Sequence, residues 1–229
     1  MKIYFFVEGR RTEPRIYPYW LSYLIPELSK LQRFDENCLN GYFIFSGFGY
    51  PHLLDEIMQN SIEDINNSGD YDYFVLVIDA EELSIEERIE EVNLFIEKKS
   101  LSLGKTRIAI IIQNRCIETW LLGNRRIISS QPEDKTLREY LDFYNVKELD
   151  PESLGKHSNF ETHAQFHESY LKKVFSEKGL SYSKKHPRHA RDEAYLNQLI
   201  KRIEDEPNHL NSFKTFIDFC LLIKNNLAS

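Results

Sequence analysis

Four short apolar segments in the first half of the chain limit most strongly what this protein can fold into. They cover residues 2–7, 42–46, 73–79 and 107–113, and each is a nearly continuous run rich in Ile, Val, Phe or Tyr. Runs of this kind are typical of strands buried on both faces, as in a parallel sheet. The sequence therefore predicts four parallel strands at the centre of an α/β fold.

The segments between these strands are long enough for crossover helices. Apolar residues at helical spacing predict helices over residues 13–31, over 51–65 after the Gly47-Phe48-Gly49 turn, and over 84–98. After residue 113 the chain reads as helices joined by polar loops, with predicted helices at 117–122, 135–143, 163–175, 191–204 and 210–225. We expect an α/β core over 1–125 and a helical C-terminal extension over 126–229 that packs on it, with a hinge at 148–159.

Composition and charge narrow the class of protein. The chain has 229 residues, 41% of them hydrophobic, and a formal net charge of −7, which does not favour a general nucleic-acid binder. The stretch 184–191, KKHPRHAR, is nevertheless a local basic patch. The three cysteines are odd in number and widely spaced, which favours a reducing compartment. No apolar run is long enough for a signal peptide or a membrane helix, so we expect a cytoplasmic protein without membrane contact.

Acidic side chains follow three of the four predicted strands. Glu8 ends the first strand, Asp79 with Glu81 ends the third, and Glu118 lies one helical turn beyond the fourth. Ligands of an open parallel sheet gather at the carboxyl ends of its strands, so these groups should converge there. Converging carboxylates repel each other unless a cation or protons neutralise them. Carboxylate oxygens suit Mg²⁺ or Mn²⁺, and the pattern predicts a site for one of these ions. Taken singly, Glu8 is an ordinary Glu-Gly strand end, and Asp79 is also suited to cap a helix.

Three stretches carry a resemblance to a known family. A glutamate after the first strand and an acidic pair after a later one resemble the Toprim arrangement of topoisomerases, primases and overcoming-lysogenization-defect nucleases. The string VEGRRTEPRIYPYW looks like the opening of RloB-like Toprim-type nucleases, and QNRCIETWLLGN is similar to their N-P-C-x-E-x-W-L-L segment. The stretch YSKKHPRHA resembles the lysine-bearing segment of small Toprim-like proteins associated with phage defence.

The resemblance implies a Toprim-type endonuclease that acts on DNA or RNA with Mg²⁺ or Mn²⁺, as the effector of an anti-phage defence system. It implies an ATPase sensor or partner protein, and cutting both strands of a duplex would favour a homodimer. The residues it carries over have three roles. The catalytic residues that it implies are Glu8, Glu13, Asp79, Glu81 and a lysine, either Lys184 or Lys185. The metal ligands that it implies are Glu8, Asp79, Glu81 and Glu118. The nucleic-acid-binding residues that it implies are Arg10, Arg11, Lys185 and Arg188.

This chain departs from the family pattern at two places. The acidic pair is Asp79-Ala80-Glu81, which lengthens one ligand arm and leaves Glu82 as a competing choice. Arg115 stands where the family has proline after the asparagine. The acidic pair and the negative net charge favour an alternative, a noncatalytic Toprim-like module that binds a nucleotide or a partner. A receiver-like phosphoryl-transfer domain is a third possibility, and the early glutamate motif argues against it.

Other features favour structural roles. His163 and His167 stand four residues apart on a predicted helix, but no third ligand is in register, so a surface or core position is favoured over a metal site. Cys116 has no evident base beside it and is expected to be buried. Trp120 and the aromatic residues of the last predicted helix, Phe213, Phe216 and Phe219, are expected in the core.

Overall fold

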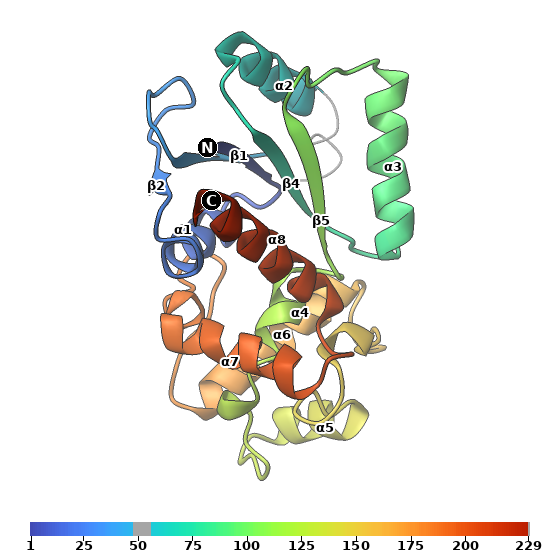
Figure 1. Ribbon diagram of the computed structural model, residues 1–229. Helices are drawn as coiled ribbons and strands as arrows, with labels where there is room; N and C mark the ends of the chain where they lie inside the picture. Colours follow the sequence, from blue (N-terminus) through green and yellow to red (C-terminus); the bar gives the residue numbers. More distant parts are fainter. Residues whose placement is uncertain (48–55, 229) are drawn as a thin grey trace.

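A computed structural model gives the structure of the protein over residues 1–47 and 56–228 (Figure 1). Its centre is an all-parallel sheet with the strand order β2-β3-β1-β4-β5. The strands are β1 (Lys2–Val7), β2 (Ser29–Lys30), β3 (Gly41–Ser46), β4 (Tyr73–Asp79) and β5 (Arg107–Gln113). The α/β class and the four long parallel strands are confirmed. The sheet has five strands rather than four, since β2 adds two exposed residues at the edge beside β3.

Eight α-helices surround the sheet within the described residues. They are α1 (Glu13–Leu24), α2 (Glu56–Ser68), α3 (Ile85–Lys98), α4 (Ile117–Leu121), α5 (Lys135–Phe143), α6 (His163–Glu177), α7 (Glu193–Asp205) and α8 (Asn211–Ala228). Short 3₁₀ helices lie at η2 (Arg125–Ile127), η3 (Pro151–Ser153) and η4 (His189–Arg191). The expected helix over 13–31 is too long, because α1 ends before Ile25 and Pro26 disfavours helical geometry in the residue that precedes it. The Gly47-Phe48-Gly49 turn and the expected start of α2 at residue 51 fall largely outside the described residues.

The two faces of the sheet are buried against different helices, which explains the continuous apolar runs. In β1, Ile3, Phe5 and Val7 belong to one hydrophobic cluster, and Tyr4 and Phe6 to the other. The first cluster contains α1, α4 and the C-terminal helices, including Trp120, Phe213, Phe216 and Phe219 as expected. The second contains residues of α2 and α3. Alternate side chains of a strand point to opposite faces, so a strand covered on both sides has no polar position.

A buried serine ties the start of α8 to the segment that follows β5. Ser212 Oγ accepts hydrogen bonds from the Asn114 backbone N–H (3.1 Å) and from Trp120 Nε1 (2.6 Å). It donates to Glu152 Oε1 (2.5 Å), and Glu152 also accepts from the Ser212 backbone N–H. Asn114 and Trp120 therefore have structural roles, and the expected hinge at 148–159 is bonded to α8. Ile3 of β1 and Ile223 of α8 belong to one hydrophobic cluster. The division of the chain into a core and an extension at residue 125 stays a prediction.

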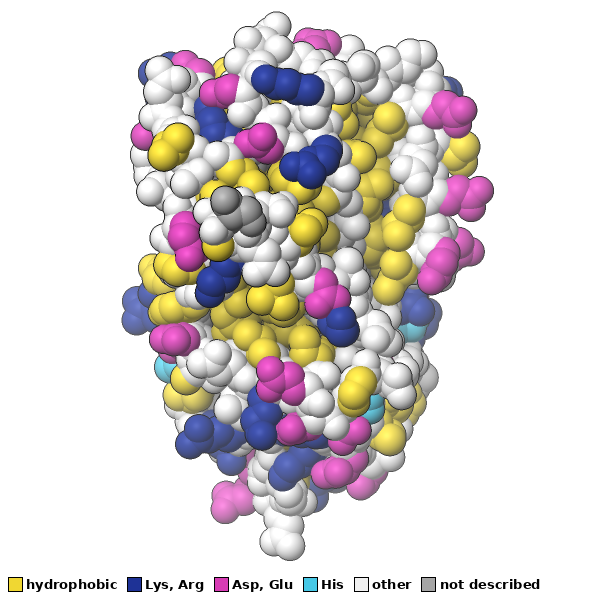
Figure 2. Space-filling model, viewed as in Figure 1, with side chains coloured by type: hydrophobic (Ala, Val, Ile, Leu, Met, Phe, Trp, Pro, Cys, Tyr) yellow, Lys and Arg dark blue, Asp and Glu magenta, His cyan; other side chains and the backbone are white. Residues whose placement is uncertain are grey.

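The strand β5 forms the edge of the sheet beside α3. Figure 2 shows hydrophobic side chains gathered between α3 and α8, where a shallow hollow of about 140 Å³ is lined by Ile85, Ile89, Ile110, Ile112 and residues at the start of α8. Ile108 of this strand is 39% exposed. Over the described part of the chain, no helix is both long and apolar enough to span a bilayer.

Candidate functional site

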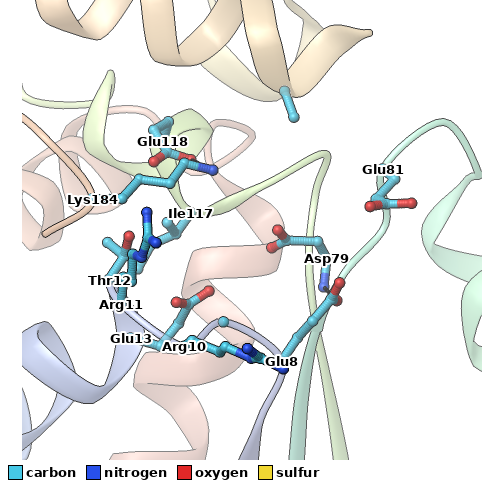
Figure 3. Close-up of a pocket in the computed structure, with 12 residues that line it drawn as sticks. Glu8, Arg10, Arg11, Thr12, Glu13, Asp79, Glu81, Ile117, Glu118 and Lys184 are labelled. Atoms are coloured by element: carbon cyan, nitrogen blue, oxygen red, sulfur yellow. Dashed lines mark hydrogen bonds and ion pairs between the residues drawn. The ribbon is translucent and has the colours of Figure 1, made fainter. Parts of the chain in front are cut away.

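Five acidic side chains, one lysine and two arginines line a single cavity at the carboxyl ends of the central strands. The cavity has a volume of about 360 Å³, and Figure 3 shows its lining side chains. They come from segments far apart in the sequence: Glu8 follows β1, Glu13 begins α1, Asp79 ends β4, Glu118 lies on α4, and Lys184 lies between α6 and η4. With Glu81, Arg10 and Arg11 also in the lining, the structure brings together all the residues expected at the site except Lys185 and Arg188.

The sheet register sets the positions of Glu8 and Asp79. β1 and β4 are paired through Val7 and Val77, and the Glu8 backbone N–H donates to the Val77 carbonyl (3.0 Å). The Glu8 side chain turns back across the strand end, where its Oε2 accepts the Asp79 backbone N–H (2.9 Å). This bond holds the Glu8 carboxylate against the backbone of Asp79, the residue that carries the second carboxylate.

Glu118 is held from both sides at the back of the cavity. Its side chain is fully buried, and its Oε1 accepts a hydrogen bond from the Tyr182 hydroxyl (2.7 Å). Lys184 Nζ lies 3.8 Å from Glu118 Oε2 and 3.7 Å from Glu168 Oε2. Of the two adjacent lysines, Lys184 therefore faces the cavity, and Lys185 is exposed outside its lining. Nothing in the sequence pattern singled out Tyr182, because its partner Glu118 is 64 residues away.

Crowding of carboxylates in a buried place raises their pKa values. Burial, followed by repulsion from Glu8, Glu13 and Glu118, holds the pKa of Asp79 well above its usual value. Burial, with repulsion from Glu118 and Glu8, raises the pKa of Glu13 to about 7. For Lys184, burial lowers the pKa, but the attraction of Glu118 and Glu168 outweighs it and the net direction is upward. Acidic side chains thus outnumber the cationic ones in the lining of the cavity, where Lys184, Arg10 and Arg11 are the cations.

Two carboxylate oxygens in the cavity lack hydrogen-bond partners. Asp79 Oδ1 and Glu118 Oε2 are buried, and neither forms a hydrogen bond within the described structure. Buried acceptors without partners are uncommon in folded proteins, and each one calls for an explanation such as an ion or a water.

The donor chemistry fits a hard divalent cation such as Mg²⁺, which binds carboxylate oxygens and keeps several waters. As the side chains stand, no group of three Asp, Glu, His or Cys among the described residues has the geometry to hold a metal ion. Cation binding would therefore require small rotations of these carboxylates toward one another.

Of the acidic pair after β4, Asp79 lies in the cavity, and Glu81 contributes only to its rim. Glu81 has a left-handed backbone (φ 52°), its carboxylate lies 3.8 Å from Arg88, and Figure 3 shows it apart from the other acids, although it contributes to the rim. Glu82 accepts hydrogen bonds from the backbone N–H of His163 (2.8 Å) and lies 2.7 Å from its ring Nδ1. Glu13, rather than Glu81 or Glu82, is thus the third acid of the cluster.

The expected nucleic-acid-binding residues divide between two places. Arg10 and Arg11 line the cavity from the exposed turn between β1 and α1. Arg188 lines a separate hollow, and Lys185 lines neither.

The remaining candidates have structural positions. His167 is buried and hydrogen-bonded to Thr119 Oγ1 (2.8 Å) and to the Leu154 carbonyl (3.2 Å), and burial lowers its pKa to about 3. Cys116 is fully buried, as expected.

The buried acids make the stability of the metal-free protein depend on pH. The pKa of Glu13 is 4.5 in an unfolded chain and about 7 in the fold, so only the unfolded state loses its proton between these values. We therefore expect the wild-type protein to lose about 3 kcal/mol of unfolding free energy, relative to Glu13→Gln, as the pH rises from about 4.5 to about 7.

Urea unfolding in EDTA at several pH values measures this difference. Glu86→Gln, at an exposed position on α3, is the control and should keep the wild-type pH dependence. If the unfolding free energies of wild type and Glu13→Gln changed with pH in the same way, Glu13 would not be protonated in the fold.

Comparison of the chain with protein-family models, with curated proteins and with solved structures finds no match.

Proposed function

We propose that the protein is a divalent-metal-dependent nuclease of the Toprim type that hydrolyses phosphodiester bonds in DNA or RNA. The observation that carries the proposal is the convergence of Glu8, Glu13, Asp79 and Glu118 with Lys184 in one cavity at the strand ends. Clusters of groups with shifted pKa values in a cleft are typical of functional sites. An excess of carboxylates over cations favours a positively charged cofactor over an anionic ligand alone.

Glu8 and Asp79, with Glu13 and Glu118 beside them, would hold Mg²⁺ or Mn²⁺. When bound, the cation supplies a Lewis acid for the scissile phosphate. A bound cation would favour the ionised forms of Glu13 and Asp79, because both pKa values are raised by the same crowding that its charge would offset.

The chain's own groups supply the other requirements of hydrolysis. Glu13 would be ionised beside a bound cation, and a carboxylate at that place is suited to take a proton from an attacking water, which makes Glu13 the candidate general base. The Lys184 ammonium would offset the negative charge that develops on the phosphate. Arg10 and Arg11, exposed at the rim, would bind backbone phosphates.

A cleavage assay tests the proposal. Wild-type protein is incubated with plasmid, single-stranded DNA and RNA in Mg²⁺, in Mn²⁺ and in EDTA, and cleavage is expected only with a metal. Glu8→Gln should reduce the rate at least about 100-fold. Glu86→Gln is the matched control and should leave the activity unchanged, because Glu86 is exposed on α3 and does not line the cavity. Absence of cleavage on every substrate, or equal activity of wild type and Glu8→Gln, would reject the proposal.

The alternative is a noncatalytic Toprim-like module that binds a nucleotide or a partner. The observation that favours it is the absence, among the described residues, of a three-ligand group already in metal-binding geometry. Binding of a nucleotide without any turnover in the same assay would support this alternative.

Gly9 gives a test of how closely Glu13 must approach the strand end. A methyl group at this position would lie 1.9 Å from Glu13 Oε2, so Gly9→Ala should push the Glu13 carboxylate aside. The displaced group is the end of a flexible side chain, so the stability cost should stay near about 1 kcal/mol. We expect Mn²⁺ affinity, measured by calorimetry, to fall about tenfold.

Gly155→Ala is the matched control for this substitution. A methyl group there meets no atom within 4 Å, so metal affinity should not change. Equal Mn²⁺ affinity of Gly9→Ala and wild type would show that Glu13 does not act at the metal.

A further inference from the structure

A second hollow adjoins the acidic cavity through the segment that carries Lys184. Its volume is about 410 Å³, and it is lined by Ser181, Tyr182, Ser183, His186, Arg188 and His189. This lining contains no carboxylate, in contrast to the first cavity. Tyr182 belongs to both environments, because it lines the hollow while its hydroxyl donates to Glu118 in the acidic cavity.

Successive side chains of the segment 181–184 contact the second hollow and the acidic cavity. Tyr182 and Lys184 reach Glu118, whereas Ser181 and Ser183 line the second hollow. Alternate side chains of an extended segment face opposite sides, so one short stretch can serve both. A polymer bound in the acidic cavity and extended across this stretch would also reach the second hollow.

The charged group of the second hollow is available for a ligand. Arg188 is exposed, and its guanidinium forms no hydrogen bond or ion pair with any described residue. Two neighbouring cations are engaged elsewhere: Lys184 with Glu118 and Glu168, and Arg191 over the Tyr19 ring at 4.0 Å. A guanidinium presents paired N–H donors that match the oxygens of a phosphate, and hydroxyl and imidazole groups add further donors.

The hollow is also built in advance of any ligand. The Tyr182 hydroxyl holds one end of the segment to Glu118, and Trp20 Nε1 holds the other by donating to the Ala190 carbonyl (3.1 Å). Between them, the His186 backbone N–H donates to the Ser183 carbonyl (2.9 Å), which closes a turn. A segment fixed in this way loses little conformational entropy on binding.

We propose that this hollow binds a phosphate group of a nucleic-acid strand whose neighbouring phosphate lies in the acidic cavity. The inference rests on the proposed function, and it adds a second contact that holds the strand in register with Glu8 and Asp79. Its donors address phosphate oxygens rather than base edges, so the contact is independent of sequence. Arg188 is thus a positioning residue for the strand.

Binding measured without cleavage tests the inference. Fluorescence anisotropy with a single-stranded oligonucleotide in EDTA gives the Kd, and Arg188→Ala should raise it about tenfold and reduce the salt slope by about one. Lys178→Ala removes a charge from an exposed position that lines neither hollow, and should change Kd less than about twofold. In the cleavage assay, Arg188→Ala should raise KM and leave kcat near the wild-type value.

Inorganic phosphate provides a probe that does not depend on nucleic acid. In proton NMR, phosphate should shift the ring resonances of His186 and His189, assigned with His186→Gln and His189→Gln, and Arg188→Ala should weaken the shift. Equal Kd values for Arg188→Ala, Lys178→Ala and wild type, or phosphate shifts absent from these two histidines, would overturn the inference. If the wild-type protein cleaved nucleic acid but showed either of these results, only the inference about this hollow would be rejected. If the hollow bound the strand and phosphate but no substrate was cleaved, only the proposed function would be rejected.

Discussion

Asp79→Asn is expected to lower cleavage about 1000-fold and, in the same protein, to raise stability. Asp79 Oδ1 is buried without a hydrogen-bond partner in the described structure, and its raised pKa reflects burial and the repulsion of three other acids. An asparagine of the same shape cannot neutralise a cation, but it removes one charge from the crowd. At pH 8 without metal we expect the unfolding free energy to rise by about 2 kcal/mol.

Two measurements on one preparation check this prediction. Initial cleavage rates in Mg²⁺ give the activity, and urea unfolding in EDTA gives the stability. Asp142→Asn, at an exposed position on α5, is the control and should change neither. If Asp79→Asn were both inactive and less stable, the Asp79 carboxylate would stabilise the fold. The loss of activity would then not identify Asp79 as a residue of the catalytic site.

Lys184→Met is expected to lower cleavage about 100-fold. The ammonium lies 3.8 Å from the fully buried Glu118 carboxylate and within the lining of the cavity. Methionine keeps the length of the side chain and removes the charge that would offset the phosphate. Lys184 is 40% exposed, so the ion pair is partly screened and its loss should cost only about 1 kcal/mol of stability.

Lys185→Met is the matched control, since it removes the same charge one residue away from an exposed position. Lys184→Arg should retain part of the activity, because it preserves the charge. Single-turnover rates at saturating substrate separate the chemical step from binding. If Lys185→Met and Lys184→Met lost activity equally, the charge of the whole basic segment, rather than the position of Lys184, would be responsible.

The sequence alone predicts the long strands and the centre of the site because both depend on short-range patterns. β1, β4 and β5 have the expected bounds, since strands covered on both faces must be apolar throughout. Glu8 and Asp79 meet because neighbouring parallel strands end at the same edge. The two-residue strand β2 has no apolar pattern, so only its pairing with β3 identifies it.

The parts of the site that were not predictable depend on local backbone geometry and on distant contacts. Glu81 is turned away because it takes a left-handed conformation and its N–H donates to the Arg115 carbonyl (3.0 Å). Left-handed backbone at a residue other than glycine is uncommon, and spacing does not indicate it. Tyr182 is part of the site through one hydrogen bond to Glu118, and only the folded chain brings these two residues together.

The wide spacing of the cavity residues along the chain also has a consequence for synthesis. A ribosome adds residues in order, and a nascent chain can carry Glu8, Glu13, Asp79 and Glu118 long before Lys184 and the Tyr182 clamp on Glu118 exist. The segment that begins α8 is added later still, and its Ser212 supports the turn before Glu118 through Asn114 and Trp120. A cavity assembled in this order reaches its final form only after residue 212 has been added, so a shorter nascent chain would lack the activity proposed for this site.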